Sequence, residues 1–237
     1  LVAGYRCAVV AAGMLRRFFP LNMTAAGTVQ PAEVVVLGAG VAGLQAIATA
    51  RRLGAVVTAT DVRPATKEQV ESLGAKFLAV EDEEFRNAQT AGGYAKEMSA
   101  EYRAKQAELI TSHIARQDIV ITTALIPGRP APKLVSAAQV ASMKPGSVIV
   151  DLAVEQGGNV EGAKAGEVAV TANGVKILGV ANLPGRIASE TLANEPSGMR
   201  SDERCGSASL RSNIAMILVC GLNGLGISQG CAPGRRN

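Results

Sequence analysis

The feature that most constrains the fold of this chain is the stretch of residues 34–61. An aliphatic segment leads into a Gly-x-Gly-x-x-Gly string formed by Gly38, Gly40 and Gly43, and a helix-forming segment follows. A second aliphatic segment then ends at Asp61. Glycine strings occur in many turns, but one placed between a strand and a helix has the context that a dinucleotide-binding βαβ unit requires. Residues 34–61 therefore predict such a unit.

Each glycine of this string has its own physical role in a unit of this kind. Gly38 allows a tight turn off the strand, Gly40 lets the backbone approach a pyrophosphate, and Gly43 lets the helix pack close to the sheet. Val41 and Ala42 lie at the start of the expected helix, where main-chain N–H groups and a partial positive charge favour phosphate groups. The turn is therefore expected to hold the pyrophosphate of a dinucleotide.

The end of the second strand bears on which dinucleotide is bound. A carboxylate at Asp61 accepts hydrogen bonds from ribose hydroxyls and repels a 2′-phosphate, which favours NAD over NADP. Val62 and Arg63 follow, and the arginine by itself would favour a 2′-phosphate. Because Asp61 occupies the strand tip, the sequence predicts NAD as the cofactor. The alternative is a doubly wound sheet whose glycine turn binds no nucleotide.

Beyond this unit the chain alternates strand and helix patterns, which predicts an α/β fold with a Rossmann-type, doubly wound and mostly parallel sheet. Aromatic residues make up only 3% of the chain, so the core must be aliphatic, as buried parallel strands usually are. The expected strands are 33–37, 56–60, 76–79, 118–122, 147–150 and 175–179, with a shorter one at 168–171. The expected helices are 42–53, 65–73, 97–115 and 136–142.

The two ends of the chain differ from this middle. Residues 4–19 predict a leading helix with its larger apolar side chains on one face, namely Val9, Val10, Met14, Leu15 and Phe18. Residues 20–32 are expected to be a linker. The sequence after residue 188 shows neither the helical nor the strand periodicity of apolar residues. We therefore expect a leading helix and linker at 1–30, the dinucleotide-binding domain at 31–188, and a divergent, irregular tail at 189–237.

Charge and cysteine content argue against two classes of function. Of the 24 basic and 20 acidic residues, residues 31–189 hold 16 of each, so the middle of the chain is neutral and does not suggest nucleic-acid binding. The four cysteines, at positions 7, 205, 220 and 231, form no Cys-x-x-Cys pair, and a single histidine cannot complete a zinc set. We expect reduced thiols, no metal site, a surface position for His113, and no transmembrane segment.

Residues 80–96 are long for a loop in an α/β domain, and long loops in compact domains are often lids. The segment opens with an acidic cluster at 81–84 and contains adjacent glycines at positions 92 and 93. Tyr94 offers a ring that can cover a flat ligand while its hydroxyl stays in water. Gly93 and Tyr94 are therefore candidate lid residues, and a solvated surface loop is the alternative.

Four segments, at 34–71, 91–106, 122–128 and 143–153, closely resemble proton-translocating NAD(P) transhydrogenase. The resemblance is to the NAD(H)-binding domain of its alpha subunit and covers roughly residues 2–188. The related alanine dehydrogenases share the glycine turn, the Pro-Gly-x-x-Ala-Pro-Lys segment and the Lys-Pro-Gly strand. They lack the Gly-Gly-Tyr-Ala-Lys-Glu-Met loop that this chain carries at 92–98.

The resemblance implies direct hydride transfer from NADH on this domain to NADP on a separate domain, coupled to proton movement through a membrane domain. Such a transfer needs two nicotinamide rings held face to face with water excluded, and no protein acid or base. No catalytic residue is therefore expected. The implied partners are an NADP-binding domain or beta subunit, the membrane domain, and a second copy of the chain. The implied location is the cytoplasmic face of the inner membrane, reached through the complex.

The resemblance also assigns positions in the site. It implies pyrophosphate contacts for the three glycines, ribose contacts for Asp61, and a place beside the adenine for Arg63. Tyr94 would be the tip of a mobile loop that closes over the nucleotide. Residues expected to line the cleft near the nicotinamide ribose follow the fourth strand, namely Thr123, Ala124 and Leu125, with prolines at 127, 130 and 132 stiffening that turn.

Two acids follow the fifth strand on the same edge, Asp151 and Glu155. Alanine dehydrogenases carry a catalytic aspartate at the position of Glu155, but the resemblance to transhydrogenase favours an ordinary loop acid.

Two departures from the family pattern leave other functions open. The lobe that precedes this domain in the family, with a loop that orients the nicotinamide, is not seen before residue 1. The sequence after residue 188 does not match the family pattern either. The alternatives are therefore an alanine-dehydrogenase-like oxidative deaminase, or a fragment that binds nucleotide without turnover.

Overall fold

The computed structural model describes residues 1–80, 85, 99–126, 128–183 and 185. Its centre is a seven-stranded sheet in the order β5-β4-β3-β6-β7-β9-β8. All neighbouring strands pair in parallel except β8, which runs antiparallel to β9 at one edge. The strands are β5 (Lys76–Phe77), β4 (Val56–Thr60), β3 (Glu33–Leu37), β6 (Ile119–Thr122), β7 (Val148–Asp151), β9 (Lys176–Gly179) and β8 (Val168–Val170). The mostly parallel sheet confirms the predicted fold class.

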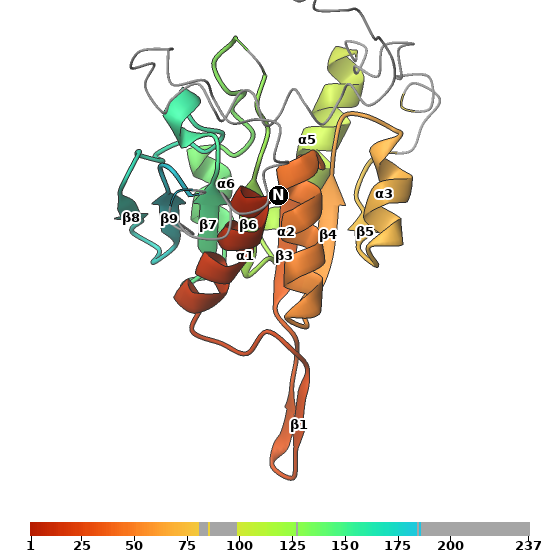
Figure 1. Ribbon diagram of the computed structural model, residues 1–237, viewed down its shortest axis with the longest axis vertical. Helices are drawn as coiled ribbons and strands as arrows, with labels where there is room; N and C mark the ends of the chain where they lie inside the picture. Colours follow the sequence, from red (N-terminus) through yellow and green to blue (C-terminus); the bar gives the residue numbers. More distant parts are fainter. Residues whose placement is uncertain (81–84, 86–98, 127, 184, 186–237) are drawn as a thin grey trace, which may run out of the picture. The chain divides into compact units, whose positions relative to one another are not determined.

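Helices cover both faces of this sheet (Figure 1). Helices α1 (Val2–Met14) and α2 (Val41–Arg52) pack beside each other on one face, and α5 (Ala100–Ile114) and α6 (Ala137–Ser142) cover the other. The short helix α3 (Thr66–Ser72) joins β4 to β5, and a single 3-10 turn, η1 (Val154–Gln156), follows β7. This is the doubly wound arrangement that alternating strands and helices predict.

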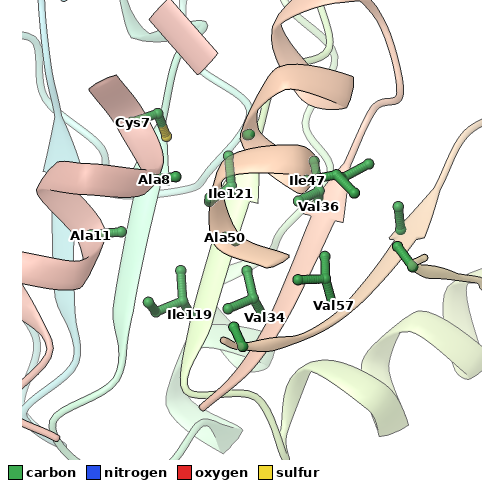
Figure 2. Close-up of a cluster of buried hydrophobic side chains, with 14 of the residues drawn as sticks. Cys7, Ala8, Ala11, Val34, Val36, Ile47, Ala50, Val57, Ile119 and Ile121 are labelled. Atoms are coloured by element: carbon green, nitrogen blue, oxygen red, sulfur yellow. The ribbon is translucent and has the colours of Figure 1, made fainter. Parts of the chain in front are cut away.

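Side chains alternate between the two faces along each inner strand. On β3, Val34 and Val36 point into the cluster under α1 and α2, while Val35 and Leu37 point into the cluster under α5 and α6. Figure 2 shows the first cluster, where Val34 and Val36 lie near Ile47 and Ala50 of α2. A strand buried on both faces needs apolar residues at every position, which explains the unbroken aliphatic run.

Helix α1 differs from its prediction in its length, and its most deeply buried residues are not the large ones. It ends at Met14, and its buried residues are the small ones, Gly4, Cys7, Ala8 and Ala11. Of the predicted apolar face, Leu15 is buried in the core and Val10 and Met14 pack against it, whereas Phe18 is 58% exposed. A Cβ at Gly4 would overlap the main-chain oxygen of the Ala42 residue in α2 and lie 2.8 Å from its carbonyl carbon. Such a close approach between two helices selects small side chains.

Residues 20–32, expected from the sequence to be a linker, contain regular structure. They form an antiparallel hairpin of β1 (Asn22–Thr24) and β2 (Gly27–Val29), in which Thr24 pairs with Gly27 across the turn. In Figure 1 the hairpin projects away from the central sheet. Its side chains are mostly exposed, so the hydrophobic pattern that marks a core strand is missing from this segment.

His113 also departs from expectation, because it is half-buried rather than on the surface. Its Nε2 lies 2.8 Å from the hydroxyl oxygen of Thr58 on β4, so it joins α5 to the sheet. Burial lowers the pKa of this imidazole below its usual range, with a further contribution from the Arg116 charge. The neutral ring therefore acts as a hydrogen-bonding partner in the packing of α5.

The remaining expectations on composition concern metals, thiols and membranes. In the part of the chain that the structure describes, no cluster of His, Cys, Asp or Glu could hold a metal ion. Cys7 is a free, buried thiol whose pKa is raised by burial; the other three cysteines lie outside the described residues. Among the described helices, none combines the length and apolar character needed to cross a membrane.

Candidate dinucleotide-binding site

Those predicted site residues that the structure describes lie where the strand order of the sheet reverses. Strands β3, β4 and β5 follow one another in one direction, while β6, β7 and β9 follow in the other, so β3 and β6 flank the switch point. The glycine turn leaves the carboxyl end of β3, Asp61 follows β4, and Thr123 follows β6. In open α/β sheets ligands bind at this edge, in the crevice at the switch point.

The glycine turn is tied to the strands on both of its sides. The Gly38 N–H donates to the Thr60 carbonyl of β4 at 2.9 Å, and the Thr123 hydroxyl donates to the Gly38 carbonyl at 2.9 Å. Gly38 has a φ of 105°, which other residues rarely adopt, and a Cβ there would lie 2.7 Å from the Thr123 hydroxyl oxygen. The structure thus requires glycine at this position.

The other two glycines differ sharply in their surroundings. A Cβ at Gly43 would overlap the Gly38 carbonyl oxygen and lie 2.9 Å from its carbon, so this glycine allows α2 to pack against the strand end. A Cβ at Gly40 would meet no atom within 4 Å. Gly40 is the N-cap of α2, whose first turn carries no acidic residue, and Val41 beside it is exposed. Among the described residues, the first turn of α2 therefore carries no acidic side chain, and the space beside Gly40 is open.

Asp61 does more than mark the end of β4. Its Oδ2 accepts the Ala39 N–H of the glycine turn at 2.7 Å, so the carboxylate holds that turn in place. Its two oxygens also bind Arg63 in a forked pair, with Nε to Oδ1 at 2.9 Å and Nη2 to Oδ2 at 3.0 Å. The hydrogen bonds to Asp61 raise the pKa of the Arg63 guanidinium. Val62 between them is exposed.

The segment after β6 is held by two polar residues that the sequence analysis did not assign to it. The Asn159 side chain accepts the Ala124 N–H at 3.1 Å and donates to the carbonyls of Ala124 at 2.9 Å and Pro132 at 2.8 Å. Asn159 is itself placed by Asp151, whose Oδ2 accepts its N–H at 2.7 Å. Both are fully buried. The adjacent Leu125 is half-buried.

The two acids after β7 have different environments. Asp151 is fully buried, and its carboxylate also accepts the N–H groups of Ala153 at 2.8 Å and Val160 at 3.0 Å. Its role is thus to shape the loop after β7. Glu155 lies in η1 and is exposed. Nothing in its surroundings sets it apart from an ordinary loop acid.

Gln106 of α5 is a second residue that sequence reasoning did not single out at this edge. Its Oε1 accepts the Val80 N–H at 2.9 Å, and its Nε2 donates to the Thr60 hydroxyl at 3.1 Å. It therefore connects the end of the β5 segment to the residue before Asp61. The candidate lid residues Gly93 and Tyr94, and most of the segment 80–96, lie outside the described residues.

Comparisons with known proteins agree with this geometry. The sequence model of the alanine dehydrogenase/PNT C-terminal domain matches residues 7–195. An NAD(P) transhydrogenase subunit alpha polypeptide of Rhodospirillum rubrum is 60% identical over 189 residues, which cover 80% of this chain and 49% of that protein. Alanine dehydrogenase of Mycobacterium tuberculosis is 38% identical over 136 residues, covering 57% of this chain and 31% of that protein.

A solved structure gives the same result. The crystal structure of transhydrogenase from Sinorhizobium meliloti superposes with a TM-score of 0.70 at 61% identity, covering 79% of this chain and 49% of that one. The chain thus spans about half the length of the curated transhydrogenase relative from Rhodospirillum rubrum. These matches confirm the resemblance seen in the sequence, and the chain belongs to the alanine dehydrogenase/PNT family, to whose C-terminal domain its residues 7–195 correspond.

Proposed function

We propose that this chain is the NAD(H)-binding component of a proton-translocating NAD(P) transhydrogenase. The observation that carries the proposal is the glycine turn at the switch point of the sheet, held by Asp61 and Thr123. The close similarity to the alpha subunit of transhydrogenase supports the reaction assigned to it. Similarity to alanine dehydrogenase is weaker and covers less of the chain, which favours transhydrogenase over oxidative deamination.

We assign roles to the residues from the positions of the described ones and from the family resemblance. The open N-terminus of α2 takes the pyrophosphate, Asp61 takes the adenosine ribose, and the segment after β6 faces the nicotinamide ribose. Bound NADH supplies the hydride, so the chain has only to bind, orient and exclude water. The residues proposed for this site are Gly38, Gly40, Val41, Ala42, Gly43, Asp61, Val62, Arg63, Gly93, Tyr94, Thr123, Ala124 and Leu125.

The partners of the reaction are proposed from the same resemblance. The hydride acceptor is NADP held by a separate NADP-binding domain or beta subunit, and a membrane domain couples the transfer to proton movement. The chain would then lie at the cytoplasmic face of the inner membrane, bound through the complex. The relatives are alpha subunits, which is consistent with an assembly of several subunits.

The decisive experiment measures coenzyme preference and transfer separately. Fluorescence titration of the chain should show NADH bound at least about tenfold more tightly than NADPH, because Asp61 opposes a 2′-phosphate. The chain alone is expected to be inactive in transfer. Adding a transhydrogenase NADP-binding domain, together with the first lobe that precedes this domain in the family, should then allow NADH to reduce an NADP analogue. Tighter binding of NADPH would contradict the role given to Asp61. Binding without any transfer would identify a nucleotide-binding fragment, and NADH oxidation by pyruvate and ammonium would favour the deaminase.

We also propose that the chain pairs with a second copy through the β1–β2 hairpin. A two-stranded hairpin alone is marginally stable in water, and this one exposes apolar side chains, with Met23 76% exposed and Leu21 50% exposed. Sedimentation should therefore show a dimer that Met23→Glu weakens by about tenfold in dissociation constant. Val170→Glu, at a similarly exposed apolar residue of β8, is the matched control. Equal effects of the two changes, or a monomeric wild type, would rule out the hairpin interface.

A further inference from the structure

The carboxylate proposed to bind the adenosine ribose already accepts four hydrogen bonds from other donors. Asp61 Oδ1 accepts the Arg63 N–H and Nε at 2.9 Å each, and Oδ2 accepts the Ala39 N–H at 2.7 Å and Arg63 Nη2 at 3.0 Å. A carboxylate offers about four acceptor positions. A ribose hydroxyl can therefore donate to Asp61 only when at least one of these donors leaves.

Burial decides which donor can leave. The side chain of Asp61 is 6% exposed, whereas that of Arg63 is 36% exposed. The main-chain donors of Ala39 and Arg63 are fixed by the glycine turn and by the backbone after β4. The guanidinium is the outermost donor on a long side chain, so it is the one that can rotate into water without disturbing the turn.

We propose that Arg63 determines the specificity of the coenzyme site by competing with the ribose for Asp61. The inference rests on the proposed function and deepens it. In its forked pair with Asp61, Arg63 occupies acceptor positions of the carboxylate. The ribose hydroxyls bind to those positions when the guanidinium turns away. The measured affinity for an NAD-type ligand is then the intrinsic affinity reduced by the fraction of molecules in which Arg63 has turned away.

The charge of Arg63 has the opposite effect on a 2′-phosphate. Paired with Asp61, the guanidinium cancels part of the negative charge that repels that phosphate. Turned away from Asp61, it is a cation close to the ribose, where a 2′-phosphate would lie. Removing Arg63 should therefore strengthen binding of the unphosphorylated ribose and weaken binding of the phosphorylated one. A residue that only supports the fold would affect both ligands in the same direction.

The test is calorimetric titration of the chain with ADP-ribose and with 2′-phospho-ADP-ribose, which isolate the adenosine half of the site. Arg63→Ala should bind ADP-ribose about two- to fivefold more tightly, the range expected when an ion pair with a partly exposed guanidinium no longer competes. Its affinity for 2′-phospho-ADP-ribose should fall, and its melting temperature should also fall, because the buried Asp61 loses a partner. Tighter binding by a less stable protein is a combination that structural damage does not produce.

Two further variants keep the result interpretable. Arg63→Lys keeps the charge but loses the forked geometry, so it should lie between wild type and Arg63→Ala for ADP-ribose. It also carries the test if the alanine variant does not fold. Arg52→Ala removes an equal charge from an exposed position in the last turn of α2, at the opposite end of that helix from the glycine turn, and should change neither affinity.

The outcomes separate the inference from the function on which it rests. A wild-type chain that binds ADP-ribose, together with Arg63 variants that bind it equally or more weakly, would overturn the competition while leaving the NAD site standing. A wild-type chain that binds no ADP-ribose would overturn the proposed function and this inference with it. Opposite shifts for the two ligands in Arg63→Ala, with Arg52→Ala unchanged, would establish it.

Discussion

Replacing Gly43 with alanine is expected to lower the free energy of unfolding by about 3 kcal/mol or more. This is the upper end of the usual cost of adding a methyl group to a well-packed site. The new methyl group would overlap the Gly38 carbonyl oxygen and lie 2.9 Å from its carbon. Both groups belong to main chain that is fixed by hydrogen bonds to Thr60 and Thr123, so neither can move aside cheaply. Urea denaturation of Gly43→Ala against wild type measures the loss.

Alanine at Gly40 is the matched control for that change, because it adds the same methyl group three residues earlier in the same turn. No atom lies within 4 Å of the added group, and the backbone at Gly40 has an ordinary extended conformation. Its stability should stay within about 1 kcal/mol of wild type, the cost of a poorer N-cap. Its affinity for ADP-ribose should fall by about tenfold or more, because the methyl group occupies the path of the pyrophosphate.

This pair of variants therefore separates folding from binding within one motif. If Gly40→Ala kept full affinity for ADP-ribose, the pyrophosphate could not lie over the N-terminus of α2. If Gly43→Ala were as stable as wild type, the inference that α2 packs too closely on the end of β3 to admit a side chain at position 43 would be wrong. If both expected results are obtained, Gly43 is needed for folding and Gly40 is needed for ligand binding.

The central sheet could be predicted because successive residues of its inner strands are all apolar. Residues 34–37 are buried on both faces of the sheet, which leaves an unbroken aliphatic run in the sequence. The turn after them needs glycine for reasons local to the turn, as at Gly38 with its positive φ. Asp61 could be placed at the site edge because the βαβ unit fixes where the second strand ends.

Helix α1 and the hairpin could not be predicted in the same way. The large apolar side chains, such as Val9 and Val10, share one face and are partly buried, while the tight contact with Ala42 most deeply buries the small residues around Gly4. That choice depends on the partner helix, which local periodicity does not describe. The hairpin lies away from the core, so no apolar alternation marks strands β1 and β2.

The residues that hold the site together were hidden for a related reason. Asn159 follows two glycines, which indicate only a turn, and nothing in the sequence shows that its amide reaches the segment after β6. Asp151 was identified as an acid at the right edge, yet its burial became visible only with the fold. The Asp61–Arg63 pair is the exception, because opposite charges two residues apart at a strand end are a signal that could have been weighed as a pair.

Replacing Asp151 with alanine is expected to lower the free energy of unfolding by about 3–5 kcal/mol, because three buried N–H groups would lose their acceptor. These donors are the main chains of Ala153, Asn159 and Val160. Asn159 would then no longer be held where it binds Ala124, so the segment proposed to face the nicotinamide should loosen as well. Chemical denaturation measures the first effect, and faster amide exchange at Ala124 measures the second.

Glu155→Ala is the control, since it removes an acid four residues further along that is exposed and lies in η1. Its stability should stay within about 0.5 kcal/mol of wild type. Hydride transfer to an NADP acceptor should be unchanged, because transfer between two nicotinamides needs no protein acid or base. A large loss of turnover in Glu155→Ala would instead make it a catalytic acid and favour the oxidative deaminase. If Asp151→Ala were as stable as wild type, the hydrogen bonds of the buried carboxylate would make little net contribution to the stability of the fold. The two acids after β7 therefore test different things: Asp151 tests the fold, and Glu155 tests the chemistry.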